Sequence, residues 1–233
     1  MKRIFAIDFI RGFAIVLMIF FNYSVTLGYF GLIQFPSNFL YWFIFPRIIA
    51  GIFIFVSGVA AYVSYKNSRE EFSKKYFLRG LKLLVFALAI TFFTYYFVPQ
   101  GTIIFGILHF FAFSSFLLPF FVANKRINLL LGLLFILIGF YLEFLNLGFS
   151  SFFWLFPQNF FTFDYFPLLP WVGVLMLGIY CGKKIAEKMA KFHIKGLSGR
   201  FVTFLGKNSL TIYLIHQPLL ILVLIVLGYR LFI

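Results

Sequence analysis

Residues 39–65 read FLYWFIFPRIIAGIFIFVSGVAAYVSY, a long apolar stretch that carries a single charged side chain, Arg47. A helix that crosses a hydrocarbon core of about 30 Å needs roughly 20 predominantly apolar residues. The stretch is long enough and apolar enough to meet this requirement. It therefore predicts a helix that spans a lipid bilayer.

The composition of the whole chain agrees with this prediction. Of the 233 residues, 63% are hydrophobic, 24% are aromatic and 11% are charged, with 40 Phe and a mean hydropathy of +1.03. A soluble domain carries about a quarter charged residues, and a chain this small leaves much of its surface exposed. The apolar surface must therefore face lipid, and the length fits a single domain over residues 1–233.

Seven stretches are long and apolar enough to cross the bilayer. They lie at about 5–25, 39–65, 77–98, 102–123, 127–147, 167–183 and 208–229. We therefore expect an all-α polytopic membrane protein, a bundle of about seven transmembrane helices. Residues 149–166, between the fifth and sixth spans, are aromatic and nearly uncharged, which is typical of an interfacial or re-entrant segment.

The cations are distributed asymmetrically along these spans. With seven spans, 17 of the 20 Lys and Arg fall on one side: Lys2, Arg3, Lys66, Arg69, Lys74, Lys75, Arg79, Lys82, Lys125, Arg126, Lys183, Lys184, Lys188, Lys191, Lys195, Arg200 and Lys207. The opposite loops, 26–38, 98–101 and 148–166, contain none. The positive-inside rule then predicts a cytoplasmic N-terminus and a C-terminus outside, and we expect the protein in the plasma membrane.

The same cations bear on the partners. The net charge of +14 could suggest nucleic acid, but its distribution over the loops favours topology and attraction to anionic membrane lipids. Steering of an anionic cytoplasmic substrate is the alternative reading. The loop between the sixth and seventh spans is expected to hold a soluble helix around 183–192. Cys181 is the single cysteine, which excludes a Cys-based metal cluster, and we expect no metal.

Charged groups inside spans are costly to bury and therefore mark candidate functional sites. The first span carries Asp8 and Arg11, three residues apart on one helix face. They can form a structural ion pair, or they can clamp a substrate. Asn22 follows fourteen residues after Asp8, nearly four turns, and so lies on roughly the same face, close to the outer surface.

Three further groups are expected in the outer half of the bundle. Arg47 lies about two turns into the second span, where snorkelling outward is an alternative role. His109, in the fourth span, either hydrogen-bonds a neighbouring helix or acts as a general base, because the ordinary pKa of histidine lies near neutrality. Asp164 precedes the sixth span, beside aromatic side chains that are typical of an interfacial belt.

The last span carries His216 two residues before Pro218. The proline frees a carbonyl one turn back, which polar neighbours can satisfy, so a structural role is favoured for His216. The expected depths of these polar groups in the membrane divide them into two sets. The outer set consists of Asn22, Arg47, His109 and Asp164. The inner set consists of Asp8, Arg11, Asn208, Ser209 and His216. Polarity at both ends of a bundle fits either a transporter or a membrane-spanning transferase.

Several of these stretches resemble a known family. They are IDFIRGFAIVLM at 7–18 followed by FNY at 21–23, FIFVSG at 53–58, FGILH at 105–109, DYFPLLPWVG at 164–173, and LGKNSL at 205–210 followed by HQP at 216–218. In their order and spacing over nearly the whole chain, they resemble the heparan-α-glucosaminide N-acetyltransferase catalytic-domain family of transmembrane acyltransferases.

The resemblance implies transfer of an acetyl or acyl group from cytoplasmic acetyl-CoA to an amino or hydroxyl group of a sugar or glycolipid on the outer side. Related acyltransferases carry a catalytic His fourteen residues after the Asp, where this chain has Asn22. On chemical grounds His109 is then the expected base, Asp164 orients it or the acceptor, and Arg47 or Asn22 stabilises the oxyanion.

The donor is expected on the inner side. Arg11 would hold its phosphate or pantetheine end, and the other donor-side candidates are Asp8, Asn208, Ser209 and His216. Cytoplasmic lysines would gather the anionic donor. Homo-oligomerisation is possible on this sequence. A small transporter or flippase, or a catalytically silent member that only binds lipid or partners, are the alternative functions.

Overall fold

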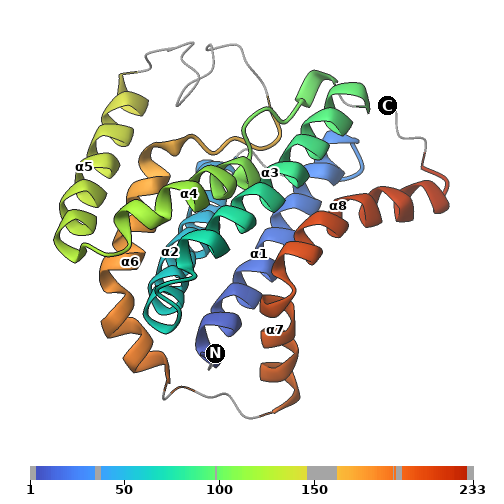
Figure 1. Cartoon of the computed structure of the whole chain (residues 1–233). Coiled ribbons are helices and arrows are strands. Elements are labelled where there is room, and N and C mark those ends of the chain that lie inside the picture. Colours follow the sequence, from blue (N-terminus) through green and yellow to red (C-terminus); the bar gives the residue numbers. More distant parts are fainter. Residues whose placement is uncertain are drawn as a thin grey trace. The chain divides into compact units, whose positions relative to one another are not determined.

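The computed structural model describes residues 4–34, 38–97, 99–145, 162–190, 192 and 196–229, and every regular element in this part of the chain is helical. In order, the elements are α1 (Phe5–Tyr29), the π-helical turn η1 (Leu40–Ile44), α2 (Phe45–Asn67), α3 (Phe72–Phe97), the 3-10 turn η2 (Pro99–Gly101), α4 (Ile107–Phe121), α5 (Lys125–Phe144), α6 (Leu168–Ala190), α7 (Leu197–Lys207) and α8 (Ser209–Val226) (Figure 1). The expected all-α class is confirmed.

Six helices are long and apolar enough to cross a membrane, namely α1, α2 together with η1, α3, α5, α6 and α8. The fourth expected span is shorter than the 102–123 predicted, because α4 begins only at Ile107 and has 15 residues. Most of the expected interfacial segment 149–166, namely 149–161, lies outside the described residues. Together these helices indicate a multi-pass membrane protein.

The prediction of a separate loop helix around 183–192 is wrong. Residues up to Ala190 continue α6, and the separate helix is α7, which begins at Leu197. The error has a physical cause, because a polar run of Lys and Glu is as typical of the extension of a long helix beyond the membrane as it is of an independent helix.

Contacts divide the chain into two compact units, which are described separately. Unit 1 comprises 1–56 and 184–233, and so contains α1, the start of α2, the end of α6, α7 and α8. Unit 2 comprises 57–183, with the rest of α2 and α6 and all of α3, α4 and α5.

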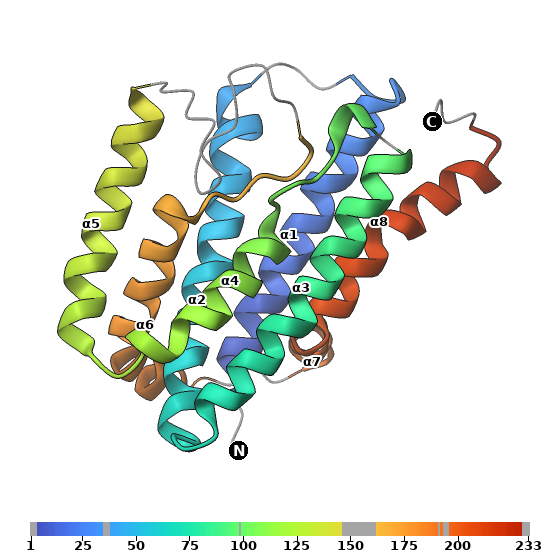
Figure 2. The same ribbon diagram turned by 45° about the horizontal axis from the view of Figure 1, so that its top comes forward.

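Unit 1 is organised by a close crossing of α1 and α7. Figure 2 looks nearly along α7 while α1 lies across the view, so the two helices cross steeply. At the crossing, a Cβ on Gly12 would collide with the carbonyl oxygen of Val202, and a Cβ on Gly206 would collide with the carbonyl oxygen of Asp8. Only the two glycines let the backbones approach this closely, as small residues do in other membrane helix pairs.

Unit 2 uses the same device between α5 and α6. A Cβ on Gly132 would lie 3.2 Å from the carbonyl oxygen of Gly173, and one on Gly173 would lie 2.5 Å from that of Gly132. The helix α4 packs along α3, where Phe116 occupies the space over Gly80. The core of this unit is formed by fully buried side chains such as Phe110 and Met176.

The crossing of α1 and α7 gives a first prediction. The variant Gly206→Ala should lower the stability of the protein in detergent by roughly 1–3 kcal/mol or more, because its methyl group meets main-chain atoms that cannot turn aside. Ser198→Ala on the exposed side of the same helix is the matched control and should stay within about 0.5 kcal/mol of the wild type. Equal thermal unfolding temperatures for the two variants would contradict the close backbone contact between α1 and α7 at Gly206.

Candidate functional site

The predicted site residues fall into both units. Unit 1 contains Asp8, Arg11, Asn22, Arg47, Asn208, Ser209 and His216, and unit 2 contains His109 and Asp164. Within unit 1 the structure brings Asn22 and His216 into contact. Within unit 2 it brings His109 and Asp164 to the same end of α4.

His109 lies in the first turn of α4 and is 5% exposed. Its Nδ1 accepts a hydrogen bond from the backbone N–H of Gly106, at 3.2 Å. Its Nε2 lies 3.3 Å from the hydroxyl of Thr91 on α3. That hydroxyl donates its one proton to the carbonyl oxygen of Ile103, at 2.6 Å, so it can only accept from the ring.

These bonds define the state of the His109 ring. Nε2 carries the proton and donates it to Thr91, while the lone pair of Nδ1 is occupied by Gly106. Nδ1 therefore caps the start of α4, in the manner of a helix-capping side chain, and Nε2 ties this helix end to α3. A base needs a free lone pair within reach of its substrate, and in this arrangement His109 presents none.

Asp164 supports the same helix end from a distant part of the sequence. One of its carboxylate oxygens, Oδ2, accepts from the backbone N–H of Ile107 at 2.9 Å, and a Cβ on Gly106 would collide with that oxygen. A carboxylate at a helix N-terminus pairs an otherwise unsatisfied donor and interacts favourably with the helix dipole. Burial raises the pKa of the neighbouring Tyr165 phenol, which therefore stays protonated as a donor.

Residues 102–106, between η2 and α4, are not helical, yet main-chain groups of this stretch are paired. Ile103 donates its N–H to the hydroxyl of Thr94, at 3.1 Å, and the carbonyl oxygen of Phe105 accepts from the N–H of Phe166, at 2.9 Å. Thr91 and Thr94 were not singled out from the sequence. Their spacing of three residues near the end of an apolar span is the signal that could have indicated them.

The second cluster, in unit 1, centres on His216 of α8, which is 6% exposed. Its Nδ1 lies 2.7 Å from the carbonyl oxygen of Tyr213. A carbonyl only accepts, so Nδ1 carries the proton. Its Nε2 lies 3.1 Å from Nδ2 of Asn22 on α1, and that amide nitrogen donates to the remaining lone pair.

His216 therefore has the opposite tautomer to His109. Its basic nitrogen, Nε2, points at a side-chain amide that can turn away, and its Nδ1 is held by a backbone carbonyl that fixes the ring. This is the arrangement of a base oriented by a third group. The prediction that Asn22 and His216 lie in opposite halves of the bundle is wrong, because the two side chains are in contact.

Two more bonds align α1 with α8 around Pro218. The hydroxyl of Tyr23 donates to the carbonyl oxygen of His216 at 3.0 Å, and the hydroxyl of Thr26 donates to the side-chain oxygen of Gln217 at 3.1 Å. Tyr23 and Thr26 thus supply polar partners to His216 and Gln217, while satisfaction of the carbonyl one turn before Pro218 stays a prediction. Tyr23 was quoted only as part of a motif, and its bond depends on a contact between helices that one sequence does not reveal.

Arg47 reaches back by one turn of its helix. Its guanidinium lies 3.4 Å from the centre of the Phe43 ring, and Nη1 donates to the carbonyl oxygen of Phe43 at 3.3 Å. The side chain is half-buried. This geometry combines a cation–π contact with a hydrogen bond to the backbone, and its role as an oxyanion donor stays a prediction.

The donor-side candidates lie around the crossing of α1 and α7. Asp8 is buried, and Arg11 is half-buried three residues further along α1. Asn208 ends α7, and its side-chain amide donates to the carbonyl oxygen of Phe204 at 2.9 Å, while Ser209 begins α8. Asn208 thus satisfies a helix terminus, and donor binding by this set stays a prediction.

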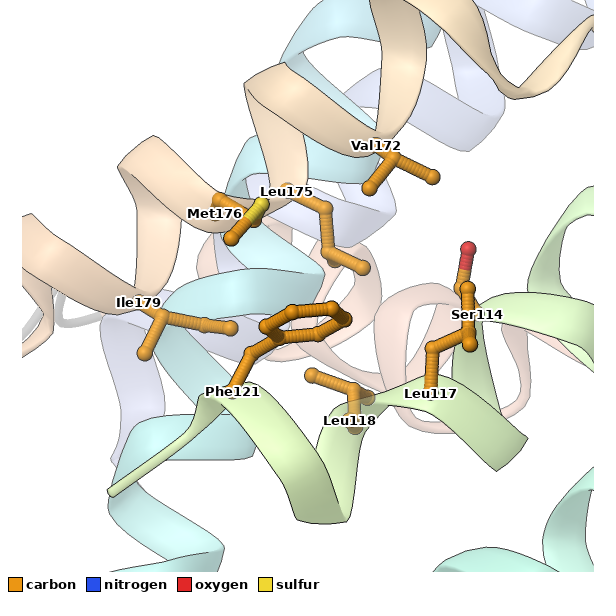
Figure 3. Close-up of a pocket in the computed structure, with 8 residues that line it drawn as sticks. All are labelled: Ser114, Leu117, Leu118, Phe121, Val172, Leu175, Met176 and Ile179. Atoms are coloured by element: carbon orange, nitrogen blue, oxygen red, sulfur yellow. The ribbon is translucent and has the colours of Figure 1, made fainter. Parts of the chain in front are cut away.

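Unit 2 also holds an apolar cavity between α4 and α6 (Figure 3). Its volume is about 10 Å³, enough for one water molecule at most. Ser114, Leu117, Leu118, Phe121, Val172, Leu175, Met176 and Ile179 line it. The Ser114 hydroxyl is buried and has no hydrogen-bond partner among the described residues. With no titratable group, this cavity does not supply acid–base chemistry.

The fold and these two clusters define a polytopic membrane protein that buries a few polar side chains among apolar helices. The chain belongs to the family described as heparan-alpha-glucosaminide N-acetyltransferase, catalytic, whose family model matches residues 3–218. The match covers nearly the whole chain and confirms the resemblance, and it makes the chain a member of a family of membrane acyltransferases. Comparison with curated proteins and with solved structures gives no match.

The capping role of Asp164 can be separated from any catalytic one. Asp164→Ala should destabilise the protein by about 1–2 kcal/mol, because the N–H of Ile107 loses its acceptor. Asp164→Asn keeps an acceptor oxygen and should recover most of that loss. Thermal unfolding of both variants in detergent checks this, and equal loss in both would mean that charge, not capping, is the contribution.

The unpartnered hydroxyl in the cavity gives a matched pair of serine variants. Ser114→Ala removes a hydroxyl that has no partner and should leave stability unchanged or raise it. Ser115→Ala removes a bond to the carbonyl oxygen of Phe111, 2.7 Å long, and should cost up to about 1 kcal/mol. A larger loss for Ser114→Ala would show that a water bridges its hydroxyl.

Proposed function

We propose that the protein is a membrane-bound acyltransferase that moves an acetyl or acyl group from acyl-CoA on the cytoplasmic side to an amino or hydroxyl group of a sugar or glycolipid on the outer side. Family membership supports the reaction class. The contact that carries the proposal is the bond between Asn22 and His216, because it leaves a buried imidazole with a basic Nε2.

In the proposed reaction, Nε2 of His216 takes the proton from the acceptor's N–H or O–H as that atom attacks the thioester carbonyl carbon. The tetrahedral intermediate then collapses, the C–S bond breaks, and the thiolate leaves with that proton as free CoA. The products are the acylated acceptor and CoA, so no oxidant or further reactant is required.

Asn22 suits both protonation states of this ring. Its Nδ2 donates to neutral Nε2, and after a half-turn of the amide its Oδ1 can accept from the protonated Nε2. A fixed donor or a fixed carboxylate would serve only one of the two states. This property gives Asn22 a role at the position where related acyltransferases carry a histidine.

The other candidates take supporting roles in the proposal. His109 and Asp164 hold the start of α4, so the proposal assigns the role of general base to His216 and not to His109. Arg47 provides a cation for the oxyanion. Arg11, with Asp8, Asn208 and Ser209, forms the donor side.

The proposal predicts a contrast between two neighbouring residues of α8. In lipid nanodiscs with acetyl-CoA and a panel of amino sugars and glycolipids, release of free CoA thiol measures turnover. His216→Ala should lower turnover by roughly 10²–10⁴-fold. Gln217→Ala removes the adjacent bond between α1 and α8 and should keep turnover within a few-fold of the wild type.

His109→Ala completes the comparison. It should reduce thermal stability while the fraction that stays folded keeps most of its turnover. If the wild type releases no thiol with any acceptor, acyl transfer is excluded and a transporter becomes the better reading. If His216→Ala stays active while His109→Ala does not, the base is His109.

A further inference from the structure

Among the described residues of unit 1, one face of α7 has no packing partner, although the other face is tightly packed. Gly199, Thr203 and Gly206 are buried, and Gly206 lies at the crossing with α1. On the opposite side, Leu197 is 85% exposed, Phe201 60% and Phe204 58%. At 3.6 residues per turn these three side chains lie within about 60° of arc, so they form one apolar strip.

Two cations border this strip. Arg200 and Lys207 are exposed, and on the same helical wheel both project from the flank next to Phe204. Half-buried apolar residues, Val202 and Leu205, occupy the other flank. A helix with one apolar side and cations at its border is typical of an element that lies in the plane of a membrane surface.

The position of α7 in unit 1 fits such an element. It crosses α1 steeply at Asp8 and Gly12, near the beginning of that span (Figure 2). Only Asn208 separates its last residue from the first residue of α8, which is another span. A helix that crosses one span at a large angle and is joined directly to the end of another span is expected at the membrane surface, where the spans leave the hydrocarbon.

We propose that the exposed face of α7 binds anionic phospholipids of the leaflet at the N-terminal end of α1, with Leu197, Phe201 and Phe204 among the upper acyl carbons and Arg200 and Lys207 on the phosphates. Cations border the apolar strip and α7 carries no carboxylate, so charge complementarity selects an anionic lipid over a zwitterionic one. Each cation near such a surface favours an anionic lipid roughly fivefold.

The test uses the full chain in nanodiscs and does not depend on activity. Cys181→Ser provides a cysteine-free background, and Leu197→Cys carries an environment-sensitive fluorophore. Phosphatidylcholine with a quencher at a shallow or a deep acyl carbon reports the depth. Shallow quenching stronger than deep quenching is expected, whereas the same fluorophore at Glu187→Cys in the polar end of α6 should be quenched by neither.

Lipid selectivity is measured in two samples that differ only in which lipid carries the shallow quencher. In one sample a minor fraction of phosphatidylglycerol carries it, and in the other an equal fraction of phosphatidylcholine. Phosphatidylglycerol should quench the fluorophore at position 197 several-fold more strongly. Arg200→Gln with Lys207→Gln should remove this preference and leave the depth unchanged. Lys184→Gln with Lys188→Gln removes the same charge from α6 and should retain the preference.

Three results would overturn the proposal. The first is a fluorophore at position 197 that is quenched from water and by no lipid. The second is unquenched, blue-shifted emission that depends on protein density in the membrane, which would mean that a second copy of the chain covers α7. The third is equal quenching by the two lipids in the wild type, which would leave a membrane contact without anionic selectivity.

Discussion

Hydrocarbon offers no hydrogen bonds, so a polar group within the bilayer has to find its partner inside the protein. The structure of this chain follows from that constraint. Among the described residues, some polar side chains on the spans pair with another helix, as Asn22 does with His216, and others turn onto their own backbone, as Arg47 does onto Phe43. Close helix packing at Gly12 and Gly206 brings the partners within reach.

The two buried histidines show how the same constraint gives two different chemistries. His109 has the backbone N–H of Gly106 on one nitrogen and the Thr91 hydroxyl on the other, and it becomes part of the cap of α4. His216 has a carbonyl on one nitrogen and an amide on the other. Because an amide can present either of its ends, this second pair can accommodate a change of protonation that the first cannot.

Much of the fold was predictable from the sequence. Apolar length fixes the spans to within a few residues, since nothing but a helix satisfies its own backbone in lipid. The exceptions are informative. The start of α4 was predicted at 102 instead of Ile107, because the non-helical residues before it are as apolar as a helix, and Phe166, which pairs with Phe105 in this stretch, lies far away in the sequence.

The candidate site was predictable only as a set of residue types. A buried polar residue in a span signals a role, so Asn22, His109, Asp164 and His216 could all be selected. Their pairing could not, because it depends on how helices distant in sequence pack together. The tautomer of each histidine depends on whether its neighbours, the Thr91 hydroxyl and the Tyr213 carbonyl, donate or accept, and this is set by the folded structure.

The short length of α4 has a consequence for the thickness of the barrier. Its 15 residues rise about 22 Å, whereas the hydrocarbon core is about 30 Å thick. The difference is left to the stretch before Ile107, whose main-chain groups bond Thr94 and Phe166. Non-helical backbone at this depth is stable only inside protein or beside water. In unit 2 the helical part of this segment is therefore shorter than a hydrocarbon core is thick, and non-helical residues with paired main-chain groups continue from its N-terminal end.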